Sequence, residues 1–206
     1  MGSRAMFAVD DGRVRGYYWL HWGSAAYQIP NLATFIRYCR TRGITPTVEA
    51  FERFARIFTA GQLPTEPVPA AWWTQEGTDA ETRYEFTIGA GRPVRLLAEI
   101  RHPAAGPRCW HTAYQSTGDA QLYRAAARAR DRMATDIRRL AARNPGLVGT
   151  RWLPLPEPRA VLADAARFRR WAADAAINED AAGSGPAGQA RPPDQPAAAR
   201  PAAARP

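Results

Sequence analysis

The chain of 206 residues has no lysine, only two cysteines and only three histidines. Cys39 and Cys109 are too few for a disulfide framework, and no apolar segment follows the basic Arg4 as a secretory signal requires. No stretch approaches the roughly 20 apolar residues of a membrane-spanning helix. We therefore expect neither a membrane span nor a disulfide-rich secreted domain, and a soluble cytoplasmic protein fits these absences best.

The scarcity of cysteine and histidine also limits the chemistry that the chain can support. A closed zinc site takes four ligands, commonly in C-x-x-C or H-x-x-x-H spacing, and neither spacing occurs. Cys109 and His111 share one face of a predicted strand and His102 precedes them, so an enzyme with an unfamiliar site there stays an alternative. The turn at residues 89–91 lies between two predicted strands, whereas a phosphate loop precedes a helix. We predict no metal and no cofactor.

All 28 basic residues are arginine, against 19 acidic residues, and the net charge is +9. Arginine together with abundant alanine and proline is what codon bias in a GC-rich genome produces, so its identity alone says little. The excess over the acids is more informative, because Asp and Glu could have balanced it. Residues 118–177 hold 12 arginines and 6 acids, whereas residues 178–206 hold 3 of each. This charge favours an acidic partner, above all nucleic acid, with an anionic membrane surface as the rarer case.

The first 60 residues are predicted to form a β-hairpin and two helices. The strands are Met6–Val9 and Arg13–Trp22, and an Asp-Gly pair supplies the tight turn between them. The second strand has apolar side chains on both faces and is predicted to be central and covered. The helices follow as residues 31–42, ended by Gly43, and as a segment capped by Thr45.

This helical pair, residues 31–57, allows a helix-turn-helix whose second helix would enter a DNA groove. Its second helix is charge-balanced, with Arg53 and Arg56 against Glu49 and Glu52, and it lacks the amide side chains that read base edges. The alternative is that both helices pack on the hairpin.

Residues 61–82 are rich in proline and are predicted to connect the two halves, with Trp72 and Trp73 packing the connector onto a core. Residues 83–177 are predicted to fold as an antiparallel βββαβα unit. Its long helix runs from Asp119 to Arg143, a short strand covers Leu147–Leu153, and a final helix runs from Pro158 to Ala176. Residues 178–206 are predicted to be a disordered tail, because from Ala181 onward no large apolar residue occurs. The fold class is therefore α+β.

The long helix carries the most informative pattern in the sequence. At about 100° per residue, an apolar arc lies beside a cationic one. The cationic arc is a predicted phosphate-binding stripe of Arg124, Arg128, Arg132, Arg139 and Arg143, and Arg37 and Arg40 are possible additions. The alternative is an ordinary solvated face, partly neutralised by Asp131 and Asp136.

The sequence thus predicts a non-enzymatic, arginine-rich accessory protein that binds nucleic acid, with DNA favoured over RNA. Small basic proteins of this kind are common on plasmids and other mobile elements, and by this association we expect a plasmid or mobile-element origin. The alternative from another class is a protein-interaction module that receives its partner on Tyr17, Trp19 or Trp22. The sequence does not indicate an oligomeric state.

Overall fold

The computed structural model describes residues 4–21, 23–58, 63–64, 66–74, 79–101, 110–145 and 156–183. Within them six strands form one mixed sheet in the order β3-β2-β1-β4-β5-β6, so the α+β class is confirmed. The strands are β1 (Ala5–Asp10), β2 (Arg15–Leu20), β3 (Glu66–Pro67), β4 (Thr82–Thr87), β5 (Arg95–Arg101) and β6 (Trp110–Thr117). The helices are α1 (Ala25–Arg42), α2 (Val48–Phe58), α3 (Ala71–Thr74), α4 (Asp119–Arg143) and α5 (Pro158–Gly183).

The predicted hairpin forms, with β1 antiparallel to β2. Its turn depends on Asp11, whose Oδ1 accepts hydrogen bonds from the backbone N–H groups of Arg13 and Val14, both at 2.9 Å. The other oxygen, Oδ2, accepts from the N–H of Val48 at 3.0 Å, where α2 begins. One carboxylate therefore closes the hairpin and caps a helix. Burial alone would raise the pKa of Asp11, but the three backbone donors outweigh it and lower the pKa below its usual value.

A parallel pairing of β1 with β4 joins the hairpin to the second half of the chain. Phe7 lies opposite Tyr84 in this pair, and their rings stack with centroids 4.6 Å apart. The buried Tyr84 hydroxyl donates to the carbonyl oxygen of Gly23 at 2.7 Å. The hairpin β1-β2 and the strands β4, β5 and β6 therefore belong to one sheet. From β4 onward the predicted antiparallel meander β4-β5-β6 forms.

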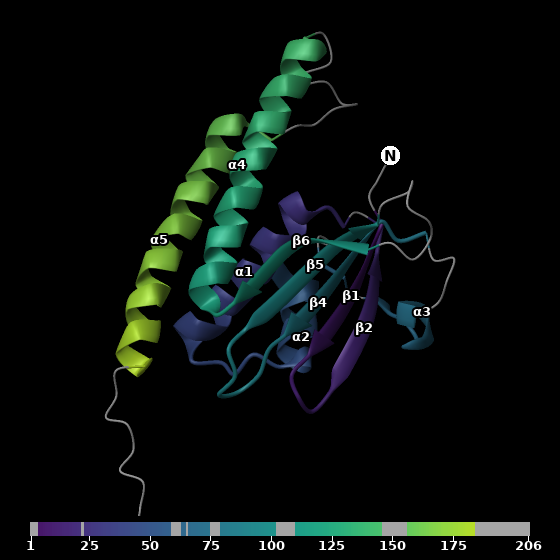
Figure 1. Cartoon of the computed structure of the whole chain (residues 1–206), viewed down its shortest axis with the longest axis vertical. Helices are drawn as coiled ribbons and strands as arrows, with labels where there is room; N and C mark the ends of the chain where they lie inside the picture. The colour runs from purple at the N-terminus through teal and green to yellow at the C-terminus, as the bar shows by residue number, and fades with distance from the viewer. Residues whose placement is uncertain are drawn as a thin grey trace, which may run out of the picture.

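Helices α1 and α2 cover one face of the sheet (Figure 1). Phe51 of α2 packs against Tyr18 of β2, with ring centroids 5.8 Å apart, and the Tyr18 hydroxyl donates to Glu52 at 2.9 Å. Phe35 of α1 lies between Phe51 and Phe86. These contacts agree with packing on the hairpin rather than with a helix-turn-helix, because the apolar side of α2 is buried in the sheet.

Two boundaries of this helical pair differ from the prediction. Helix α1 begins at Ala25 rather than at residue 31 and carries Pro30 inside it. Proline removes the hydrogen bond to the carbonyl four residues back, and Arg130 of α4 donates to that carbonyl, Ala26 O, at 3.4 Å. The cap of α2 is Thr47 rather than Thr45, since Thr47 Oγ1 accepts from the N–H of Ala50 at 3.1 Å. Gly43 ends α1 as predicted, with φ 63°.

The opposite face of β2 is covered by α3. Trp72 meets the edge of Trp19 with centroids 6.0 Å apart, and Trp73 lies 6.0 Å from Tyr17. The two tryptophans therefore pack the connector onto the sheet, as predicted. The two-residue β3 pairs with Tyr18 and Trp19, so β2 is internal to the sheet there. Only Tyr18 of β2 is buried, so the strand is less covered than predicted.

Helices α4 and α5 form a long pair beside α1 and the β6 edge (Figure 1). The bounds of α4 are those predicted. Helix α5 begins at Pro158 as predicted but continues to Gly183, so residues 178–183 of the predicted tail are helical. They are held there because Glu179 Oε1 accepts from the backbone N–H of Ala120 at 3.2 Å. The predicted strand at 147–153 and the rest of the tail lie outside the described residues.

Replacing Asp11 by alanine tests the double role of this carboxylate. We expect Asp11→Ala to lower the free energy of unfolding by about 1–2 kcal/mol at pH 7, because a turn and a helix N-terminus lose their acceptor. Since the folded-state pKa is lowered, this stabilisation is complete above the unfolded carboxyl's pKa of about 4 and is lost as the pH falls through the folded value. Urea unfolding of both proteins between pH 7 and pH 3 measures the difference, and a constant difference across that range would contradict the assignment.

Candidate functional site

Helix α4 is the element that positions both candidate sites. It has 25 residues and is therefore about 37 Å long. The predicted apolar arc is buried, apart from the half-buried Leu140. Helix α1 packs on one side of α4 and α5 on another, so residues of α4 outside the predicted arc are buried as well. Together the buried residues of α4 span about 200° of its circumference. The additional buried residues include Tyr123, Ala125, Ala127 and Ala134.

The five predicted stripe residues are all exposed on the remaining face of α4. Arg132 donates to the Tyr114 hydroxyl of β6 at 3.1 Å and lies over its ring. Arg139 has a weak partner in Asp136 at 3.8 Å, and both side chains are more than 70% exposed. Arg124, Arg128 and Arg143 have no ion pair with any residue that the structure describes.

The acid expected to neutralise Arg128 is directed elsewhere. Asp131 lies three residues from Arg128, but its Oδ2 accepts from Nη2 of Arg169 on α5 at 2.5 Å. Two further arginines, Arg138 of α4 and Arg170 of α5, are also exposed and have no described ion-pair partner. The stripe is therefore more cationic than local sequence spacing indicates.

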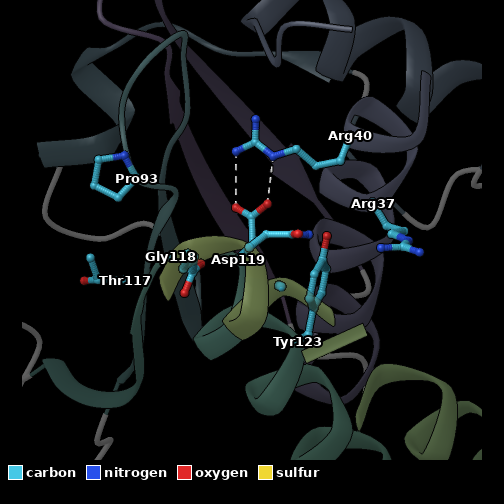
Figure 2. Close-up of a pocket in the computed structure, with 10 residues that line it drawn as sticks. Arg37, Arg40, Pro93, Thr117, Gly118, Asp119 and Tyr123 are labelled. Atoms are coloured by element: carbon cyan, nitrogen blue, oxygen red, sulfur yellow. Dashed lines mark hydrogen bonds and ion pairs between the residues drawn. The ribbon is translucent and has the colours of Figure 1, made fainter. Parts of the chain in front are cut away.

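Arg37 and Arg40 lie apart from the stripe, on the side of α4 that faces α1. Arg40 holds Asp119 through two hydrogen bonds, Nε to Oδ2 at 2.7 Å and Nη2 to Oδ1 at 3.2 Å (Figure 2). This hydrogen bonding raises the pKa of Arg40 above its ordinary value. Arg37 lies over the Trp171 ring at 5.5 Å and is 3.8 Å from Asp174. Both arginines therefore have carboxylate partners, unlike most of the stripe.

These two arginines line a pocket of about 520 Å³ at the N-terminal end of α4. Its wall is completed by the turn before α4 and by the last turns of α5, and Figure 2 shows Tyr123 directed into it. The sequence analysis missed this site. Asp119 was predicted only as the first residue of the long helix, and Glu179 was predicted to lie in the disordered tail. One signal was present, because a phenol on a buried helix face needs a polar partner.

The alternative cysteine and histidine site gains no support. His102 and Cys109 lie outside the described residues, and His111 is an exposed residue of β6. In the described part of the chain no three His, Cys, Asp or Glu side chains come together as a metal site would need. Cys39 is buried in the core, and burial raises the pKa of its thiol to about 11, so it is unreactive at neutral pH.

The aromatic residues of the predicted protein-interaction module are largely used inside the fold. Tyr17 and Trp19 contact Trp73 and Trp72, as described above, and neither is among the exposed large side chains. Trp22 lies outside the described residues. Among the described helices, none combines the length and the apolar character that a membrane crossing requires.

Comparison of the chain with protein-family models, with curated proteins and with solved structures finds no match. The function is therefore argued from the geometry of α4 and its surroundings.

A double-mutant cycle on Arg40→Gln and Asp119→Asn tests the contact that frames the pocket. We expect a coupling free energy of about 0.5–1 kcal/mol in urea unfolding, because a bidentate, partly buried pair exceeds an ordinary surface pair. Arg139→Gln with Asp136→Asn is the matched control, and its coupling should be smaller because both side chains are solvated. Equal couplings in the two cycles would show that the Arg40 pair stabilises the α1–α4 contact no more than a solvated surface pair does.

Proposed function

We propose that this chain binds double-stranded DNA through the arginine stripe of α4, without sequence specificity and without catalysis. One observation carries the proposal: Arg124, Arg128 and Arg143 stand on the exposed face of a rigid helix with no described carboxylate partner. Guanidinium groups in this state are suited to phosphate oxygens, which they bind with paired hydrogen bonds.

The placement of the acidic residues of α4 supports this proposal. The helix has seven arginines and three acids. Asp119 is bound to Arg40 and Asp131 to Arg169, and both contacts lead away from the stripe. Only Asp136 remains beside the stripe, at 3.8 Å from Arg139. The fold therefore uses two of the three acids as links between helices and leaves the cationic face largely unneutralised.

The packing of α4 favours phosphate contacts over base reading. A recognition helix must enter the major groove, which is about 12 Å wide. Helix α4 buries more than half of its circumference against α1 and α5, so it cannot enter deeply. Gln121 is the one amide side chain on its exposed face, and amides are the usual partners of adenine. The stripe extends about 28 Å from Arg124 to Arg143, which is long enough to meet several phosphates.

The salt dependence of DNA binding tests the proposal. If the five stripe arginines contact phosphates, log K should fall with log salt at a slope of about −4.5. Replacing Arg124, Arg128 and Arg143 by glutamine should reduce the slope to about −1.8 and leave stability nearly unchanged, because glutamine has a similar helix propensity. Fluorescence anisotropy with duplexes of unrelated sequence measures both quantities.

The control variant carries the same loss of charge away from α4, as Arg13→Gln, Arg53→Gln and Arg92→Gln. These side chains are exposed and have no described ion-pair partner. They should leave the salt slope close to the wild-type value. No binding of wild type at low salt, or equal effects of the two triple variants, would refute the stripe. Preferential binding of RNA duplexes would support phosphate contacts by the stripe but would show that RNA, and not DNA, is the partner.

A further inference from the structure

The pocket at the N-terminus of α4 is lined by a tyrosine whose hydroxyl has no described hydrogen-bond partner. The Tyr123 side chain is 1% exposed, and its ring packs against Trp171 with centroids 5.8 Å apart. Its hydroxyl makes no hydrogen bond to any described residue and is directed into the pocket (Figure 2). The hydroxyl oxygen is not among the fully buried polar atoms without a partner, so it opens onto the pocket. Burial also raises the pKa of Tyr123, so the hydroxyl is neutral and can donate at physiological pH.

Arginine donors surround this hydroxyl and are only partly used. Arg40 binds Asp119 through Nε and Nη2, so the hydrogens of Nη1 remain available. Arg37 is held over Trp171, and its distance of 3.8 Å to the solvated Asp174 is too long for a hydrogen bond. The Trp171 ring thus holds Arg37 at the pocket, and Arg37 has no described hydrogen bond besides its long ion pair with Asp174.

The end of α4 that closes the pocket already receives one carboxylate. Glu179 Oε1 accepts from the N–H of Ala120 at 3.2 Å, and the residue at the N-cap is Gly118, which has no side chain to accept from the helix. The positive end of a helix dipole favours an oxyanion at this place. The two acids that line the pocket, Asp119 and Glu179, are each engaged by another donor of the protein, so the acid that faces Arg37 is Asp174, at 3.8 Å.

We infer that this pocket binds a small molecule through an oxyanion, either a phosphate ester or a carboxylate, held by the Arg37 guanidinium and the Tyr123 hydroxyl. Its volume of about 520 Å³ is suited to a small metabolite rather than to a polymer. Asn178 at the rim offers both a donor and an acceptor to the rest of the ligand. The site is distinct from the DNA stripe, because Tyr123 is about 100–140° around α4 from Arg124 and Arg128.

Calorimetric titration of the full chain with three probes tests this inference: inorganic phosphate, ribose 5-phosphate and succinate, with ribose as the probe that lacks an oxyanion. We expect a phosphate probe or succinate to bind and ribose not to bind, and the better probe identifies the oxyanion. Tyr123→Phe keeps the ring and its packing, so its melting temperature should be no lower than that of wild type, while the affinity falls about tenfold. Arg37→Gln should weaken binding at least as much.

Arg128→Gln is the matched control, because it removes a charge from the same helix outside the pocket. It should leave probe affinity unchanged and reduce the DNA salt slope, whereas Tyr123→Phe should leave the DNA salt slope unchanged. The experiments can therefore contradict the inferred oxyanion pocket and the proposed DNA-binding stripe independently of each other. Absence of binding by every oxyanion probe at millimolar concentration, or equal affinity of wild type and Tyr123→Phe, would overturn the inference.

Discussion

The parallel pairing of β1 with β4 is the contact on which the rest of the structure depends. β1 is buried from Ala5 to Val9 and is the only described strand with a long neighbour from each half of the chain. Its pairing with β4 stacks Phe7 on Tyr84 and continues the sheet to β6, beside which α4 and α5 pack. The same sheet thus carries α1 on the side of the hairpin and α4 beside β6, and the two helices contact each other directly. The pocket between them therefore depends on a strand more than 100 residues before Asp119 in the chain.

Local signals predicted the elements well, and pairing over long distances was not predictable from them. Three signals lie within short segments of the sequence: the Asp-Gly turn, the periodicity of α4 and the glycine at the end of α1. The structure confirms all three. The parallel β1–β4 contact has no local signature. The early start of α1 was missed for another reason: Pro30 normally marks a boundary, and only the tertiary donor Arg130 compensates the carbonyl that it leaves free.

For the candidate sites, too, the features that depend on local sequence were predictable and those that depend on tertiary contacts were not. The stripe follows from helical geometry alone, so its exposure was predictable, while its charge balance was not, because Asp131 reaches across to Arg169. The pocket collects Arg37, Tyr123 and Glu179 from three helices, and no spacing within one segment brings them together. Glu179 was not predicted as a pocket residue, because the composition of the following segment placed it in the predicted tail. Residues 177–183 include Asn178, Asp180 and Gly183, which are poor helix formers, yet they extend α5, and Glu179 binds the N-terminus of α4.

Helix α4 thus separates two kinds of electrostatic environment. On the side facing α1 and α5, each arginine near Asp119 is placed against a carboxylate or an aromatic ring, and an unpaired hydroxyl marks the gap. On the outer side, the arginines face solvent with Asp136 as the one acid of α4 beside them, and water screens their mutual repulsion only in part. Such a face gives no stability to the fold, and mutual repulsion works against it. A protein that uses two of its three α4 acids for internal links, rather than to relieve that repulsion, retains the stripe at a cost to its own stability, which is the physical argument for an anionic partner.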